Sequence, residues 1–181
     1  MMLDKLPKRK QHHLRQYDYS AAGLYFVTIC IVKHRMLLGT INEGRWKPSR
    51  LGKLVEHCWQ DIPNHWLGVE LDYFVVMPNH FHGLISISTR DSNASLPKVV
   101  QSFKAAVTRL ANKQANTAGR KLWQENYYDH VVRDDDDLAR IRKYIIENPL
   151  AWHLDRENPA RIALNPFYAY IDTMKELPRC S

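Results

Sequence analysis

The chain has 181 residues, 45% of them hydrophobic and 25% charged, a composition that indicates a globular protein and excludes a disordered or fibrous one. Its 26 lysine and arginine residues against 19 acidic ones give a net charge of +7, which favours polyanionic partners. No apolar run reaches the roughly 20 residues of a membrane span. No signal peptide is visible, and three cysteines without a CxxC pair favour reduced thiols, so we expect a cytoplasmic protein with no membrane partner.

The first third of the chain predicts a basic arm, a strand, a hairpin and a helix. Residues 1–19 are rich in lysine, arginine and histidine, and form either a solvated tail or an arm that contacts phosphates. Residues 25–32 are β-branched and aromatic, as in a buried strand, and residues 37–47 form a small hairpin around Asn-Glu-Gly. Seven apolar residues at helical spacing predict an amphipathic helix over 50–66.

The middle of the chain predicts two strands joined by a tight turn and then a second helix. Strands 70–77 and 80–88 flank Pro78 and Asn79, which supply the turn. An apolar stripe from Val99 to Leu110 marks the helix that follows.

After this helix, residues 122–133 are extended. The aspartates 134–137 precede a third helix, where acidic groups satisfy free N–H groups and the helix dipole. Beyond Pro149 the chain is punctuated by prolines and less regular.

This order of elements predicts an α+β fold. Strand, helix, strand, strand, helix, strand and helix make a ferredoxin-like βαββαβ antiparallel sheet with an added C-terminal helix that carries Tyr144. We divide the chain into the N-terminal arm 1–19, a folded domain over 20–155 and a C-terminal tail over 156–181.

The segment His80-Phe81-His82 is the strongest candidate for a functional site. Side chains alternate along a strand, so both imidazoles lie on one face while Phe81 and Ile85 lie on the opposite, apolar face. Two neighbouring imidazoles on a rigid strand form a ready metal site. The alternative is a pair of half-buried, hydrogen-bonded histidines, and the remaining residues of their face suggest that it is the more open one.

Tyr144 and Asn148 lie one turn apart on the third helix. With Ile141 and Ile145 they occupy one face at positions i, i+3, i+4 and i+7, a geometry that serves packing as well as catalysis. Asn148 can also simply end the helix before Pro149. A strand with paired histidines and a helix with an inward tyrosine together suggest metal-assisted phosphoryl transfer to a tyrosine hydroxyl.

Basic and aromatic side chains that follow the strand 80–88 are candidates for nucleic-acid contacts. The cations suit phosphates, and the tyrosines can stack on unpaired bases. A solvated helix face and an aromatic core explain the same residues equally well. The candidates are Lys98, Lys104, Arg109, Arg120, Lys121, Tyr127 and Tyr128.

Five segments, in this order, resemble the Y1 transposase family, and most closely the REP-associated tyrosine transposases, which are relatives of the IS200/IS605 transposases. The resemblance runs from about residue 17 to 155. The segments are YFVTIC at 25–30, VMPNHFHG at 76–83, SFK at 102–104, WQENYYDHVVR at 123–133 and YIIENP at 144–149.

The resemblance implies an HUH-type, metal-dependent single-stranded DNA endonuclease and transesterase in which Tyr144 forms a 5′-phosphotyrosine. It implies a divalent cation, Mg²⁺ or Mn²⁺, held by His80, His82 and Asn148, where the IS200 relatives carry a glutamine in place of the asparagine. The implied partner is single-stranded or hairpin DNA, and both homodimers and monomers occur among the relatives. A non-catalytic nucleic-acid-binding domain and a metal phosphodiesterase that uses water are the alternatives from the residues alone.

Overall fold

A four-stranded antiparallel sheet forms the centre of this computed structural model, which describes residues 22–88 and 93–176. The basic arm 1–19 lies outside the described residues. The strand order is β4–β5–β1–β6, in which β1 pairs with both β5 and β6. The strands are β1 (Gly23–Cys30), β4 (Val69–Val76), β5 (His80–Ile87) and β6 (Tyr128–Val131). This is the strand order of a ferredoxin-like sheet, and the predicted fold is confirmed.

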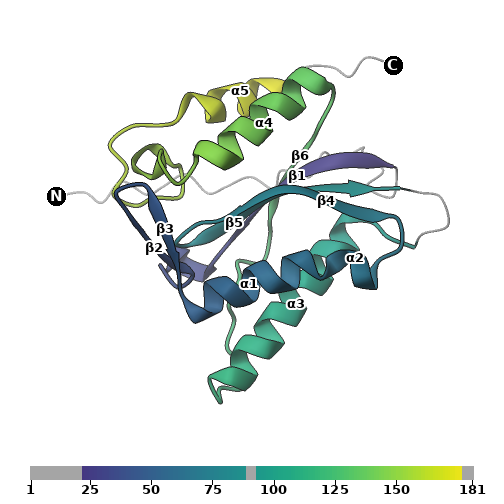
Figure 1. Ribbon diagram of the computed structural model, residues 1–181, viewed down its shortest axis with the longest axis vertical. Coiled ribbons are helices and arrows are strands. Elements are labelled where there is room, and N and C mark those ends of the chain that lie inside the picture. The colour runs from purple at the N-terminus through teal and green to yellow at the C-terminus, as the bar shows by residue number, and fades with distance from the viewer. Residues whose placement is uncertain (1–21, 89–92, 177–181) are drawn as a thin grey trace.

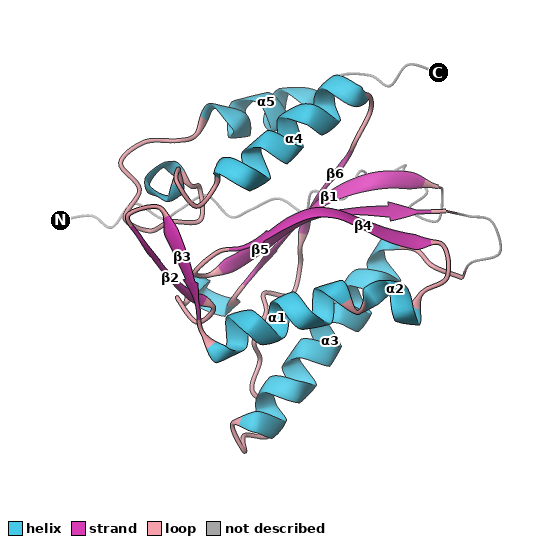
Figure 2. Ribbon diagram, in the orientation of Figure 1, coloured by secondary structure: helices cyan, strands magenta, loops and turns pink. Residues whose placement is uncertain are grey.

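Helices cover both faces of the sheet (Figures 1 and 2). One face carries α1 (Arg50–Gln60), α2 (Ile62–His65) and α3 (Leu96–Gln114), and the other carries α4 (Asp135–Glu147) and α5 (Pro166–Glu176). The predicted hairpin is present as β2 (Gly39–Asn42) and β3 (Arg45–Pro48), and two 3₁₀ turns, Val32–His34 and Trp152–Leu154, lie in the connections. No helix of the described chain is long and apolar enough to cross a membrane.

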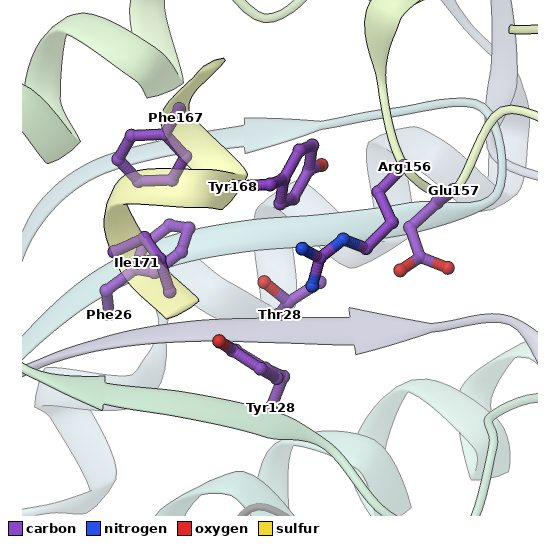
Figure 3. A pocket seen from close by; sticks show the side chains of 8 residues that line it. All are labelled: Phe26, Thr28, Tyr128, Arg156, Glu157, Phe167, Tyr168 and Ile171. Atoms are coloured by element: carbon purple, nitrogen blue, oxygen red, sulfur yellow. The ribbon is translucent and has the colours of Figure 1, made fainter. Parts of the chain in front are cut away.

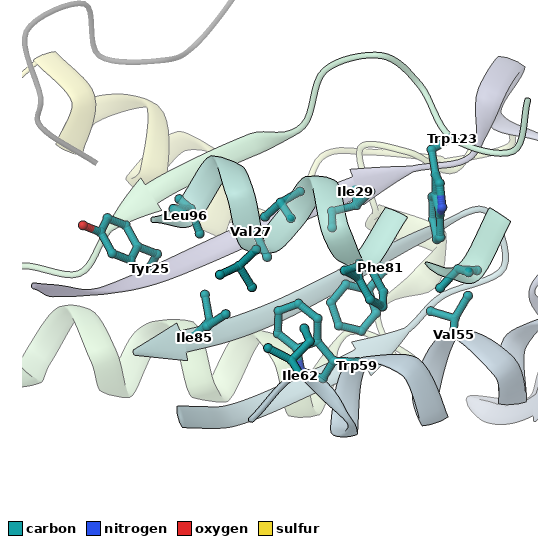
Figure 4. Packing of buried hydrophobic residues seen from close by; sticks show 14 of the residues in the cluster. Tyr25, Val27, Ile29, Val55, Trp59, Ile62, Phe81, Ile85, Leu96 and Trp123 are labelled. Atoms are coloured by element: carbon teal, nitrogen blue, oxygen red, sulfur yellow. The ribbon is translucent and has the colours of Figure 1, made fainter. Parts of the chain in front are cut away.

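The larger core lies between the sheet and α1–α3 (Figure 4). Alternate residues of β1 and β5 point into it, among them Val27, Ile29 and Phe81, because the strand period sends their neighbours to the other face. Trp59 of α1 packs on Phe81 with ring centroids 4.6 Å apart, and Phe103 of α3 closes the cluster. This packing leaves the histidines of β5 facing α4.

Two glycines set how closely α1 approaches its neighbours. A Cβ on Gly83 would lie 2.5 Å from the indole of Trp59, so glycine lets the indole lie on the sheet. A Cβ on Gly52 would lie 2.0 Å from the carbonyl oxygen of Leu38, so glycine lets the first turn of α1 press on that backbone. The position of α1 is therefore determined at both ends by residues without side chains.

The predicted helix over 50–66 is wrong in its length. Helix α1 ends at Gln60 and a separate turn, α2, begins at Ile62. Pro63 has no N–H to donate to the carbonyl of Trp59, so a continuous helix loses a hydrogen bond at that point.

Candidate active site

His80 and His82 lie on the face of β5 that α4 and α5 cover. Both are buried, with 0% and 1% of their surfaces exposed, and their Nε2 atoms are 2.9 Å apart. The sequence correctly predicted that the two rings share a face. The expectation that this face is open is wrong, because α5 and the segment before it add a layer that the sequence pattern did not reveal.

The orientation of the His80 ring follows from Asn79. The amide nitrogen of Asn79 donates to the carbonyl oxygens of Glu157 (2.7 Å) and His34 (3.3 Å), which turns its oxygen toward His80 Nδ1 at 2.8 Å. An amide oxygen only accepts, so Nδ1 of His80 donates to it, and a neutral His80 ring then has its lone pair on Nε2. Thr28 holds the His82 ring in place, because its hydroxyl lies 2.8 Å from Nδ1.

Tyr144 points from α4 at the histidine pair. Its hydroxyl lies 3.1 Å from His82 Nε2, and its ring stacks on Phe167 of α5 with centroids 3.8 Å apart. Ile141, Tyr144, Ile145 and Asn148 are all buried, as the helical spacing predicted. The predicted nucleophile and the predicted metal ligands therefore lie together.

Asp155 is the residue of this site that the sequence reasoning missed. Its Oδ2 lies 3.7 Å from His80 Nε2 and 4.0 Å from His82 Nε2, and it accepts hydrogen bonds from Asn148 and Tyr144. Burial opposes its ionisation, but His80 and His82 outweigh burial and hold the pKa of Asp155 well below its ordinary value. The site therefore contains a buried carboxylate anion beside two imidazoles.

Tyr168 of α5 is the second residue that was missed. Its hydroxyl donates to Asp155 Oδ2 at 2.9 Å and lies 2.5 Å from the Tyr144 hydroxyl. Pro166 at a helix start, followed by aromatics on neighbouring turns, was a usable signal for α5. Its contact with Tyr144 depends on a loop whose path the sequence does not reveal.

These contacts enclose the Tyr144 hydroxyl. Burial above all, and then Tyr168 and Asp155, raise the pKa of Tyr144 well above its ordinary value. Beside Tyr168, between β1 and α5, lies a cavity of only about 10 Å³ (Figure 3). That space holds about one water, so a larger molecule reaches Tyr144 only if the side chains around it move.

The donor set fits a divalent cation. Two ligands at right angles, each about 2.1 Å from an ion, lie about 3 Å apart, close to the separation of the two Nε2 atoms. His80, His82 and Asp155 offer ligand atoms within 4.8 Å of one another. Oδ1 of Asn148 is buried and accepts no hydrogen bond from the described chain, which leaves this oxygen available as a ligand.

The predicted nucleic-acid contacts do not gather at this site. Lys98, Lys104 and Arg109 lie on α3, on the opposite face of the sheet, and Arg120 and Lys121 lie in the exposed segment after it. Lys104 donates to the carbonyl oxygens of Gln124 and Glu125, and burial lowers its pKa, so it ties α3 to that segment.

Tyr127 and Tyr128 pack into two different hydrophobic cores, one on each face of the sheet. Tyr127 is half-buried against the core under α1–α3, and Tyr128 is buried in the smaller core around Tyr144. Neither ring lies open for stacking in this conformation.

Comparison with known proteins links this geometry to one family. The sequence profile of the family described as "Transposase IS200 like" matches residues 26–148. An uncharacterized protein of Haemophilus influenzae is 34% identical over 167 residues, which cover 82% of this chain and 92% of that protein. A putative REP-associated tyrosine transposase of the same organism is 27% identical, and the match covers 74% of this chain and 73% of that protein.

A solved structure shares the fold. A REP-associated tyrosine transposase bound to a REP hairpin superposes with a TM-score of 0.60 at 18% identity, over 79% of this chain and 74% of that one.

Proposed function

This chain belongs to the IS200-like transposase family and is a tyrosine transposase, and from that premise we propose that it cuts and rejoins single-stranded DNA through Tyr144. The observation that carries the proposal is the Tyr144 hydroxyl, 3.1 Å from His82 Nε2 beside a buried imidazole pair. The net charge of +7 and the hairpin bound by the solved relative support hairpin-containing DNA as the substrate.

In the proposed reaction the Tyr144 hydroxyl gives up its proton to water, and its oxygen attacks the scissile phosphorus. The bond from phosphorus to the 3′ oxygen breaks and the 3′ oxygen takes up a proton. The fragment on the 3′ side of the break stays on Tyr144 through its 5′ phosphate, as a phosphotyrosine. The phosphotyrosine keeps the phosphodiester energy, so the 3′ hydroxyl of a strand can attack it and release Tyr144.

We propose His80, His82, Asp155 and Asn148 as the set that holds a divalent cation, Mg²⁺ or Mn²⁺. When bound, such an ion polarises the scissile phosphate and stabilises the charge of the transition state. The residues themselves prepare the site: Asn79 and Thr28 orient the imidazoles, and α5 keeps water out.

The nucleophile is tested by asking which half of the DNA becomes attached to the protein. A hairpin with a single-stranded flank, labelled at its 3′ end, should give a labelled protein band on a denaturing gel, and a 5′ label should not. Tyr144→Phe should abolish both the band and the cleavage, while Tyr73→Phe, a change at a 47% exposed tyrosine, should leave them intact. Cleavage by Tyr144→Phe without attachment would instead indicate a phosphodiesterase that uses water.

The cation site is tested by calorimetry with Mg²⁺ and Mn²⁺ in the absence of DNA. His80→Ala or His82→Ala should weaken ion binding at least tenfold, and the exposed His65→Ala should not. Equal ion binding by all variants would assign the histidines a structural role.

A further inference from the structure

A second cavity, of about 690 Å³, lies on the face of the sheet opposite Tyr144, between α1, the C-terminal end of α3 and the segment that follows α3. Ligand sites of roughly 300–1,000 Å³ are the usual size for small organic molecules. Leu37, Leu51 and Leu122 give the cavity an apolar floor, and all three belong to the core under α1–α3 or pack against it. The floor is therefore held in place by the fold.

The rim of the cavity is positively charged. Arg50, Lys53 and Arg120 line it, all three are exposed, and no acidic residue of the described chain lines it. None of the three pairs with an acidic side chain among the described residues, so their charges are available to a ligand. Three cations around an apolar floor suit a ligand with both anionic and flat apolar parts.

The start of α1 adds to the positive electrostatic potential of the rim. Arg50 is the first residue of an eleven-residue helix, and the N-terminus of a helix favours anions through its dipole and free N–H groups. Ser49 caps only the N–H of Gly52, at 3.0 Å. The close contact of Gly52 with the backbone of Leu38 keeps this helix end beside the cavity.

We propose that this cavity is a second DNA subsite, which binds an unpaired nucleotide of the substrate away from the scissile phosphate. The three cations hold its phosphates, and the leucine floor takes its sugar and base. The base has to be unpaired, because a base in a duplex is stacked between its neighbours and cannot reach the floor. The proposal rests on the proposed function, since it assigns the cavity to the same DNA.

The first test measures binding without cleavage. In a Tyr144→Phe background, the added changes Arg50→Gln, Lys53→Gln and Arg120→Gln should weaken affinity for a hairpin with a single-stranded flank about tenfold or more near physiological salt. The slope of log affinity against log salt should fall by about 2 to 3, as expected for three lost phosphate contacts.

A control variant removes the same charge elsewhere. Arg45→Gln, Lys47→Gln and Lys143→Gln remove three exposed cations that do not line the cavity, and this variant should lose clearly less affinity. Equal losses in the two variants would show that net charge alone acts, and would overturn the proposal.

A second test addresses the floor. Abasic substitutions, made one position at a time along the single-stranded flank, should weaken binding by the Tyr144→Phe protein at one position. In the cavity variant, which adds Arg50→Gln, Lys53→Gln and Arg120→Gln, the missing base at that position should no longer change the affinity. A uniform profile would overturn the proposal. Binding of a free deoxynucleoside monophosphate to the cavity, without any effect of the cavity variant on DNA affinity, would overturn it in favour of a small-molecule site. The covalent attachment assay on the wild type tests the proposed function separately, so the two can fail independently.

Discussion

Asn79 shows how one side chain sets the chemistry of another. Its amide nitrogen donates to two carbonyl oxygens, so its oxygen faces His80 and accepts a hydrogen bond from Nδ1 of that ring. The same amide ties the β4–β5 turn to the segment that carries Asp155 and Glu157. The turn therefore both reverses the chain and fixes the orientation of the His80 ring.

At Tyr168 a single hydroxyl should control the pH at which the enzyme works. After burial, Tyr168 is the largest cause of the raised pKa of Tyr144. Tyr168→Phe removes that hydroxyl, so the pKa of Tyr144 should fall toward its ordinary value and the rise of the cleavage rate with pH should move to lower pH. Single-turnover rates of covalent attachment across a pH series measure this. An unmoved or upward-shifted profile, in a variant that folds normally, would refute it.

Residue periodicity explains which site residues were predictable. His80 and His82 are two residues apart on a strand, and Tyr144 and Asn148 are four apart on a helix, so each pair shares a face whatever the rest of the fold does. Asp155 and Tyr168 reach the site through a loop and a separate helix. No local spacing relates them to the histidines, and so the sequence did not identify them.

Helix α4 is held in place by side-chain contacts in its first turn and near its middle. Asp137 in its first turn contacts His130 of β6 (2.7 Å) and Tyr170 of α5 (3.0 Å), and Arg142 further along binds Asp72 of β4. The sequence correctly assigned the four aspartates to the start of a helix, where Asp134 caps the N–H of Asp137. Asp137 has a further role, because it links β6, α4 and α5 around Tyr144.

Loss of the Asp137 carboxylate should destabilise the fold in a pH-dependent way. Although burial raises its pKa, hydrogen bonds from His130 and others outweigh this, and the pKa of Asp137 is lowered. Its contribution is therefore present above the pKa of an unfolded aspartate, about 3.9, and is lost as the pH falls through its lower folded value.

Urea unfolding at neutral pH should show Asp137→Asn to be less stable by about 1–3 kcal/mol. The difference from wild type should shrink in acid. Asp136→Asn, at an exposed position of the same turn, should cost less than about 1 kcal/mol. A difference that grows in acid would contradict the assignment.

For the whole molecule, the strand order was predictable and the layering was not. Alternating elements of the right length specify a ferredoxin-like sheet, and the structure has that sheet. The burial of the histidine face depends on α5, in a segment assigned to an irregular tail. Because α4 and α5 together cover that face, the site is buried between the sheet and these helices.

One chain supplies the tyrosine, both histidines and Asp155, so each molecule should be catalytically independent. A mixture of Tyr144→Phe and His82→Ala proteins should therefore give no more covalent attachment to DNA than either variant alone. The attachment assay on pre-mixed proteins measures this. It is run at protein concentrations above and below the concentration at which the protein self-associates. Restored activity would mean that Tyr144 acts on the site of a second copy.

The enclosure of Tyr144 also has a consequence for its reactivity toward small electrophiles. Acetylation by N-acetylimidazole requires an accessible phenol, and Tyr144 is 5% exposed while Tyr73 is 47% exposed. Brief treatment of the DNA-free protein, followed by peptide mass spectrometry, should find the acetyl group on Tyr73 and not on Tyr144. Equal labelling of the two would show that the pocket opens readily without DNA. The expected pattern describes a tyrosine that stays chemically inert until the residues around it rearrange.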